Sequence, residues 1–121
     1  MEQMNQEESR YRELCKRDGT DEKDIERKTL FWILSHNADL YAKRNHIYDF
    51  KERGIKPECF DSPDVDFSGG SRALVRLAFN LYNGYKDEHT DVLSILQILD
   101  HGNYILAFDA INMRMRKYSN C

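Results

Sequence analysis

The sequence predicts an all-α fold, a compact single domain of five to six helices packed around a central helix, with one long irregular loop. Two stretches, 71–85 and 104–117, repeat apolar residues at the three- and four-residue spacing of a helix face. A third stretch, 20–34, starts with acidic residues and ends in five consecutive apolar ones. Because helix dipoles favour acids in the first turn, this order favours a buried helix over a buried strand.

Length and composition limit the class of protein. The chain has 121 residues, of which 40 % are hydrophobic and 32 % are charged, so we predict one soluble globular domain covering residues 1–121. The formal net charge of −3 provides no basic excess for wholesale binding of nucleic acid or acidic membranes. The longest apolar run, Leu30–Leu34, is too short to span a bilayer, and we expect no membrane association.

The start of the chain and the cysteines indicate a compartment. Met1 is followed by a polar, charged run and not by the apolar region of a signal peptide. The three cysteines, Cys15, Cys59 and Cys121, are odd in number and widely spaced. We therefore expect a cytoplasmic protein with reduced thiols.

The first 40 residues predict three helices. Residues 1–19 form a polar helix, partly frayed at its start, which packs through a narrow stripe and ends at Gly19. Thr20 then begins a second helix, with acids in its first turn and a deeply buried end. Asn37 ends this helix and caps a short third one, from Ala38 to about Lys43.

The middle of the chain is less regular. Residues 45–53 fit a short helix and an irregular turn equally well. Residues 54–70 contain prolines and glycines without periodicity, and an irregular connection of that length is unusual in a compact domain. This segment is either a functional loop, or it hides a helical turn or a short strand at Val65–Phe67. Four apolar side chains are expected to hold it on the core: Ile55, Phe60, Val65 and Phe67.

Three further helix signals complete the prediction. Ser71 begins the central helix, and Asn83–Gly84 end it. A short, almost wholly apolar helix follows from Val92 to Leu99, and Asn103 caps the last helix. The predicted core consists of Leu30, Trp32, Ile33, Leu74, Leu77, Ala78, Leu81, Leu96, Leu99, Phe108 and Ile111.

The start of the central helix is a candidate anion site. Glycines before a helix expose backbone N–H groups, and Ser71, Arg72 and Arg76 could add a hydroxyl and positive charge. The pattern lacks the GxxxxGK[ST] signature of a phosphate-binding P-loop. The simpler interpretation is a flexible turn with a serine cap.

No motif predicts a catalytic, cofactor or metal site. The acids of the long loop match an EF-hand only loosely in their spacing: Asp61, Asp64 and Asp66. The histidines and cysteines show no CxxC, HxxxH or HExxH spacing. Cys59 with His46 or His36 is a candidate nucleophile and base, although thiols are often inert packing groups. We therefore expect no enzyme, no cofactor and no metal.

Aromatic residues beside Asn and Asp predict a binding surface. Such clusters are typical of protein contacts, and they equally close the ends of a small helical domain. The candidate contact residues are Tyr48, Phe60, Phe67, Tyr82 and Tyr85. We predict a protein-interaction module, regulatory or inhibitor-like, with an unidentified protein partner. A homodimer is compatible, because the apolar helix at 92–99 needs cover.

The alternative is a nucleic-acid- or nucleotide-binding protein. Four arginines could form its basic patch: Arg72, Arg76, Arg114 and Arg116. The net charge and the absence of a helix-turn-helix signature count against nucleic acid.

Several runs of residues resemble a known family. They are Asp24–Leu34, Ile47–Phe50, Ile55–Cys59, Val65–Ser68 and Arg76–Tyr85. From about Asp24 onward the chain is similar to a family of short, single-domain bacterial proteins of unknown function, found in Gram-positive genomes and mobile elements. The resemblance implies a stand-alone cytoplasmic domain and supplies no catalytic residues. Occurrence in mobile elements would favour a host- or defence-directed binding role.

Overall fold

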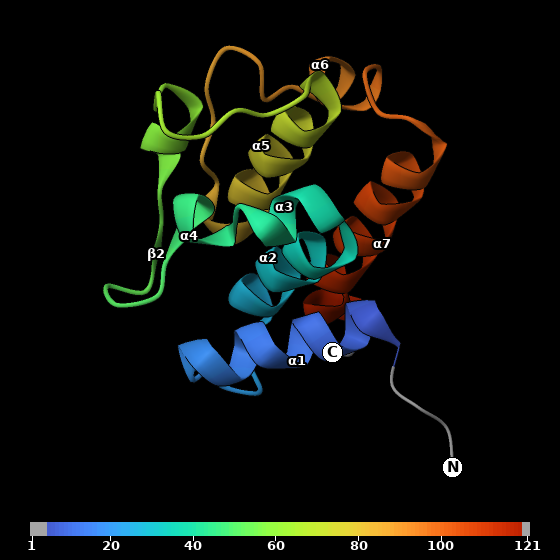
Figure 1. Ribbon diagram of the computed structural model, residues 1–121. Coiled ribbons are helices and arrows are strands. Elements are labelled where there is room, and N and C mark those ends of the chain that lie inside the picture. The colour runs from blue at the N-terminus through green and yellow to red at the C-terminus, as the bar shows by residue number, and fades with distance from the viewer. Residues whose placement is uncertain (1–4, 120–121) are drawn as a thin grey trace.

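The computed structural model describes the backbone of residues 5–119 and the side chains of residues 5–116, so Met1–Met4, Asn120 and Cys121 lie outside it. The described chain contains seven α-helices, one 3-10 helix and a β-hairpin of two-residue strands (Figure 1). This confirms the predicted all-α class. No helix in the described range is long and apolar enough to cross a membrane.

Two polar caps set the limits of the first two helices. Helix α1 (Gln6–Asp18) follows Asn5, whose side-chain oxygen accepts the N–H of Glu8 at 2.7 Å, and it ends as predicted at Gly19. Helix α2 (Ile25–His36) begins later than predicted. Asp24 accepts the N–H of Arg27 at 3.0 Å, and its own N–H bonds to the carbonyl of residue 21, so residues 21–24 form a turn.

The segment after α2 is helical and then extended. Helix α3 (Ala38–Ala42) is capped by Asn37, as predicted. Helix α4 (Arg44–Ile47) leads into an antiparallel hairpin of β1 (Tyr48–Asp49) and β2 (Gly54–Ile55), with the first residue of β1 opposite the last of β2. The predicted alternatives for this segment, a short helix or a turn, therefore did not include the hairpin.

The long loop contains a helical turn, which was one of the predicted alternatives. The 3-10 helix η1 (Pro57–Phe60) follows β2, and the described residues form no strand at Val65–Phe67. Helix α5 (Gly69–Asn83) begins two residues before the predicted start, because Ser68 accepts the N–H of Ser71 at 3.2 Å. It ends as predicted at Gly84, where φ is +81°.

The last two helices differ from the prediction at their ends. Helix α6 (Val92–Leu96) is capped by Asp91 and stops three residues early. Helix α7 (His101–Ser119) begins before Asn103, because the carboxylate of Asp100 accepts the N–H of Asn103 at 2.8 Å. The capping residue is therefore Asp100.

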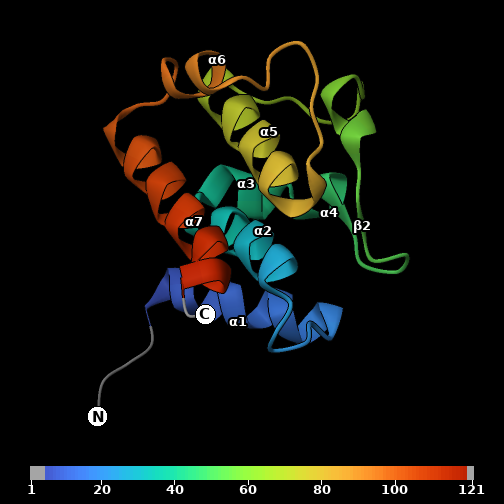
Figure 2. The same cartoon turned by 180° about the vertical axis from the view of Figure 1, so that it is seen from behind.

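Helix α2 lies at the centre of the molecule, between α1 below it and α5 and α7 at its sides (Figures 1 and 2). It also packs against α3, whereas α5 packs against α2, α3, α6 and α7. The prediction that α5 is buried among other helices is right. The centre is shared with α2, because Leu30, Phe31, Ile33 and Leu34 are all fully buried.

Ten of the eleven predicted core residues pack in or against the core, and Phe108 on α7 does not. Five predicted residues are buried: Leu30, Ile33, Leu74, Leu77 and Ala78. Five others are half-buried and pack against the core: Trp32, Leu81, Leu96, Leu99 and Ile111. Phe108 is 39 % exposed, because α7 instead buries the smaller Ala107 and Ala110. These two small side chains let α7 approach α2 closely.

Candidate functional site

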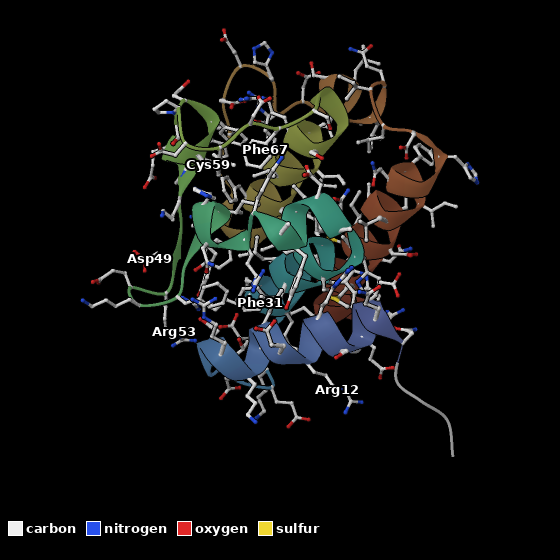
Figure 3. The ribbon with its side chains drawn as sticks, in the orientation of Figure 1. Arg12, Phe31, Asp49, Arg53, Cys59 and Phe67 are labelled. Carbon is white, nitrogen blue, oxygen red and sulfur yellow. The ribbon has the colours of Figure 1, made fainter. Side chains whose placement is uncertain are left out.

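Tyr48 lies in a buried polar network and is no contact residue on the surface. Its hydroxyl donates to the Asp18 carboxylate at 2.6 Å and accepts from Arg27 Nε at 3.0 Å. Asp18 also accepts from the Thr20 hydroxyl and from two nitrogens of Arg53, at 3.1 and 3.2 Å. We call these five residues the Asp18 network. In Figure 3, Arg53 lies at the hairpin, beside the end of α1.

The network keeps Asp18 charged. Burial acts to raise the pKa of this carboxyl, but hydrogen bonds from Arg53, Thr20 and Tyr48 outweigh burial and hold the pKa below its usual value. Burial raises the pKa of the Tyr48 hydroxyl, and its bond to Asp18 adds to the effect. The network therefore joins α1, α2 and the hairpin, and Tyr48 is corrected from a candidate partner contact to a structural residue.

The other aromatic candidates pack mainly on one another. Phe67 is buried at 6 % exposure, so it too is corrected from surface to core. The half-buried Phe60 meets the edge of Phe79, with ring centroids 5.6 Å apart, and Tyr85 packs against both rings. The half-buried Tyr82 lies under the guanidinium of Arg27. These aromatics close one end of the domain, which was the alternative interpretation of the pattern.

The predicted anion residues are only partly brought together. Ser71 is buried, and its hydroxyl donates to Asp39 at 3.0 Å, away from solvent. Arg72 donates to the carbonyl of Phe60 at 2.9 Å, and Arg76 donates from Nε to Asp87 at 3.0 Å. The two guanidiniums share the ring of Phe60, whereas Ser71 has no part in this arrangement.

The four arginines of the nucleic-acid alternative do not lie on one surface. Arg72 and Arg76 lie on the first half of α5. Arg114 donates to the carbonyl of Leu81 at 2.7 Å, near the other end of that helix, and faces Glu26 at 3.6 Å. Arg116 lines a separate depression with Trp32.

Neither Cys59 nor the loop acids form a reactive cluster. Burial raises the pKa of the Cys59 thiol to about 11, and neighbouring Glu58 adds to the shift. A thiol with that pKa is almost wholly protonated at neutral pH and is a weak nucleophile. Among the residues that the structure describes, no three His, Cys, Asp or Glu side chains are arranged to hold a metal ion.

The most exposed apolar side chains lie on α6, on α7 and between them. Seven of them are between 39 % and 73 % exposed, and we refer to them as the α6–α7 surface: Val92, Leu93, Ile98, Tyr104, Ile105, Phe108 and Met115. Both views show α7 at the edge of the molecule opposite the hairpin (Figures 1 and 2). The sequence predicted the part at 92–99, as an apolar helix that needs cover, but not the part on α7.

Helix α7 has two apolar faces. Leu106, Ala107 and Ala110 are buried, whereas Tyr104 and Phe108 point outward with their ring centroids 4.8 Å apart. Positions 104, 108 and 115 lie on one side of a helix, and positions 106, 107 and 110 lie on the other. The signal was therefore present as a second stripe, but spacing alone does not say which stripe is buried.

Acidic residues border one part of the α6–α7 surface. Between residues 87 and 113 the chain contains five Asp or Glu residues and no Lys or Arg. Asp91 and Asp100 cap α6 and α7, and Asp109 follows Phe108; all three are exposed. Negative charge thus borders the part of the surface between residues 91 and 109, whereas Arg114 and Arg116 flank Met115 at its far end.

An apolar notch adjoins this surface. A cavity of about 80 Å³ opens between α5, α6 and α7, and Leu77, Val92, Ile95 and Ile111 help to line it. Val92 belongs to both the notch and the exposed surface. The arrangement therefore combines exposed apolar side chains with a depression of about the size of one small side chain.

Comparison with known proteins identifies the family. The model of a family of unknown function, DUF6075, matches residues 2–121. The chain belongs to the DUF6075 family. This confirms the resemblance to a family without assigned activity. No curated protein and no solved structure matches the chain.

Proposed function

We propose that this DUF6075 protein is a protein-interaction module whose α6–α7 surface docks onto a basic amphipathic helix of another protein. The carrying observation is the set of seven exposed apolar side chains on α6, on α7 and in the short segment between them. Single exposed apolar residues are normal on proteins, but a gathered set typically marks an interaction surface. The predicted regulatory or inhibitor-like role in the cytoplasm belongs to this proposal.

The apolar part of the surface supplies the affinity. Burying one large apolar side chain contributes about 1.5–3 kcal/mol before the costs of association are subtracted. Tyr104 and Phe108 are already in contact with each other, so docking freezes few of their rotamers. The notch beside Val92 offers a place for one apolar side chain of the partner. These features suit the apolar face of a helix.

The acidic residues beside the surface determine which kind of partner is favoured. Asp91, Asp100 and Asp109 favour a helix whose apolar face is flanked by Lys or Arg. A second copy of this chain would bring the same three carboxylates to the interface, and like charges oppose that association. The border therefore favours a basic partner over the homodimer that the sequence left open.

A peptide-display selection on the full chain tests the proposal without knowing the partner. We expect the enriched peptides to form helices with an apolar face and Lys or Arg at its sides. The Ile105→Ser, Phe108→Ser double variant should bind them at least about tenfold more weakly, since two exposed apolar anchors are lost. Asp109→Asn should bind more weakly at low salt and lose this difference at high salt.

Three results would contradict the proposal. They are the absence of enrichment, enrichment of peptides with acidic flanks, and equal binding to the wild type and the double variant. Sedimentation velocity covers the remaining alternative. A dimer that the double variant abolishes would show that a second copy, and not a basic helix, covers this surface.

A further inference from the structure

A cavity of about 340 Å³ lies between the start of α5 and the α6 region, and it meets the α6–α7 surface only at Ile98. Its lining includes Arg72, Arg76, His89, Ser94, Gln97 and Ile98. We propose that this cavity binds the phosphate group of a small phosphate ester. The inference does not depend on the docking of a helix at the α6–α7 surface.

Arg72 provides the uncompensated charge. Its guanidinium lies over the rings of Phe60 and Phe67, 5.7 and 5.8 Å from their centroids, and one nitrogen donates to the Phe60 carbonyl. Within residues 5–116, no carboxylate lies within ion-pair distance of Arg72. The group is therefore held in place in the wall of the cavity, and an incoming anion need not order it.

Arg76 provides a second, fixed set of donors. Its Nε bonds to Asp87, whose carboxylate also accepts from the hydroxyls of Tyr85 and Thr90. Asp87 cancels the charge of Arg76 but leaves the two terminal nitrogens without hydrogen-bond partners among the described side chains and carbonyls. The Arg76–Asp87 pair therefore adds hydrogen-bond donors in a fixed position, while the net positive charge comes from Arg72.

The opposite wall provides further hydrogen-bonding groups. Ser94 and Gln97, on and next to α6, bring a hydroxyl and an amide, and His89 brings an imidazole. Ile98 provides an apolar wall above Gly69, where a Cβ atom would stand 2.6 Å from Ile98 Cδ1. Glycine at position 69 thus leaves room for this wall.

Size and chemistry select the class of ligand. A phosphate monoester presents three charged oxygens, which match the forked donors of two guanidiniums better than the two oxygens of a carboxylate do. The volume lies at the lower end of the range for small-molecule sites, about 300–1,000 Å³. A single depression of this size fits a small ester and not a polymer that tracks a groove.

Titration of the isotopically labelled full chain, followed by amide NMR shifts, tests the assignment. The probes are inorganic phosphate, ribose 5-phosphate, a nucleoside monophosphate and sulfate, each at one ionic strength held with potassium chloride. We expect saturable shifts confined to Gly69, Arg72 and the side-chain amide of Gln97. An ester should bind more tightly than inorganic phosphate. Shifts that do not saturate, or that spread over the Lys and Arg residues of the whole surface, would overturn the assignment.

Two matched variants locate the site. Gln97→Glu places a carboxylate at an exposed position of the cavity wall, and we expect ester affinity to fall at least about tenfold. Asn112→Asp makes the same change of net charge on α7, outside the cavity, and should change affinity by less than about twofold. An equal loss of ester affinity in the two variants would contradict the proposal. So would a single-stranded oligonucleotide that binds more tightly than every small ester.

Discussion

Asp18 shows how one carboxylate can hold three segments of chain together. It is buried at the end of α1, and its donors come from the turn after α1, from β1 and from the hairpin loop. Arg53 reaches it from a left-handed backbone conformation, with φ at +58°, which costs a non-glycine residue free energy. The ion pair and hydrogen bonds to Asp18 offset that cost.

The Asp18→Asn variant tests this role. An amide offers one acceptor where the carboxylate offers two, and it removes the charge that faces Arg53. We expect the free energy of unfolding to fall by about 2–3 kcal/mol in urea titrations. Asp21→Asn, at an exposed position three residues along, should change it by less than about 0.5 kcal/mol. An equal loss of unfolding free energy in the two variants would show that the Asp18 network makes no specific contribution to stability.

The Cys59 thiol gives a second test on a single residue. Because burial raises its pKa to about 11, the thiol should react with iodoacetamide at pH 8 at least roughly 100-fold more slowly in the native protein than in urea. The measurement needs a Cys15→Ser, Cys121→Ser background, so that one thiol reports. Fast native alkylation would show that Cys59 is accessible and ionised, and would reopen its role as a nucleophile.

Helix ends show where sequence reasoning succeeds and where it fails. The chain offers two polar caps about three residues apart at several starts, such as Ser68 and Ser71 for α5, and Asp100 and Asn103 for α7. Either cap of each pair could accept an orphan N–H group. Which one does so depends on the turn before it, so the helices were predicted correctly and their first residues were not.

The hairpin and the functional surface depended on long-range contacts. Strands of two residues give no alternation, and the loop lacks the Asn-Gly signal of a tight hairpin. On α7, both apolar stripes were visible, but only the packing of Ala107 and Ala110 decides which one faces the core. Arg72 and Arg76 were recognised from sequence, whereas the α6 side of their cavity lies some twenty residues further along the chain.

The end of α5 allows a clean test of a helix cap. Gly84 has φ at +81°, and a Cβ there would meet no atom within 4 Å, so Gly84→Ala tests backbone strain alone. We expect a loss of about 1 kcal/mol in the free energy of unfolding. Gly54→Ala is the matched control, because that position is equally open and its φ is not in the left-handed region; it should be neutral within about 0.5 kcal/mol. Equal effects would contradict the strain argument.

On the scale of the whole molecule, three carboxylates with a lowered pKa stabilise three different connections between segments of the chain. Asp18 holds α1 to the hairpin, Asp24 caps α2 and pairs with Arg27, and Asp87 holds the segment after α5 to Arg76. In each case burial acts to raise the pKa, and hydrogen bonds from neighbouring side chains and backbone outweigh it. Protonation of these three carboxylates therefore weakens all three connections over the same range of pH.

These lowered pKa values determine how stability should respond to acid. In the unfolded chain a carboxyl of this kind titrates near about 3.9, above its pKa in the folded protein, so the unfolded state binds protons first as the pH falls. The contribution of the three carboxylates is full above about pH 5 and is lost as the pH falls through 4 and below. Urea titrations at successive pH values should show this decline. Asp18→Asn and Asp87→Asn should each make it shallower, whereas Asp21→Asn should leave its slope unchanged. A free energy of unfolding that rises on acidification would contradict the claim that these carboxylates stabilise the fold in their charged form.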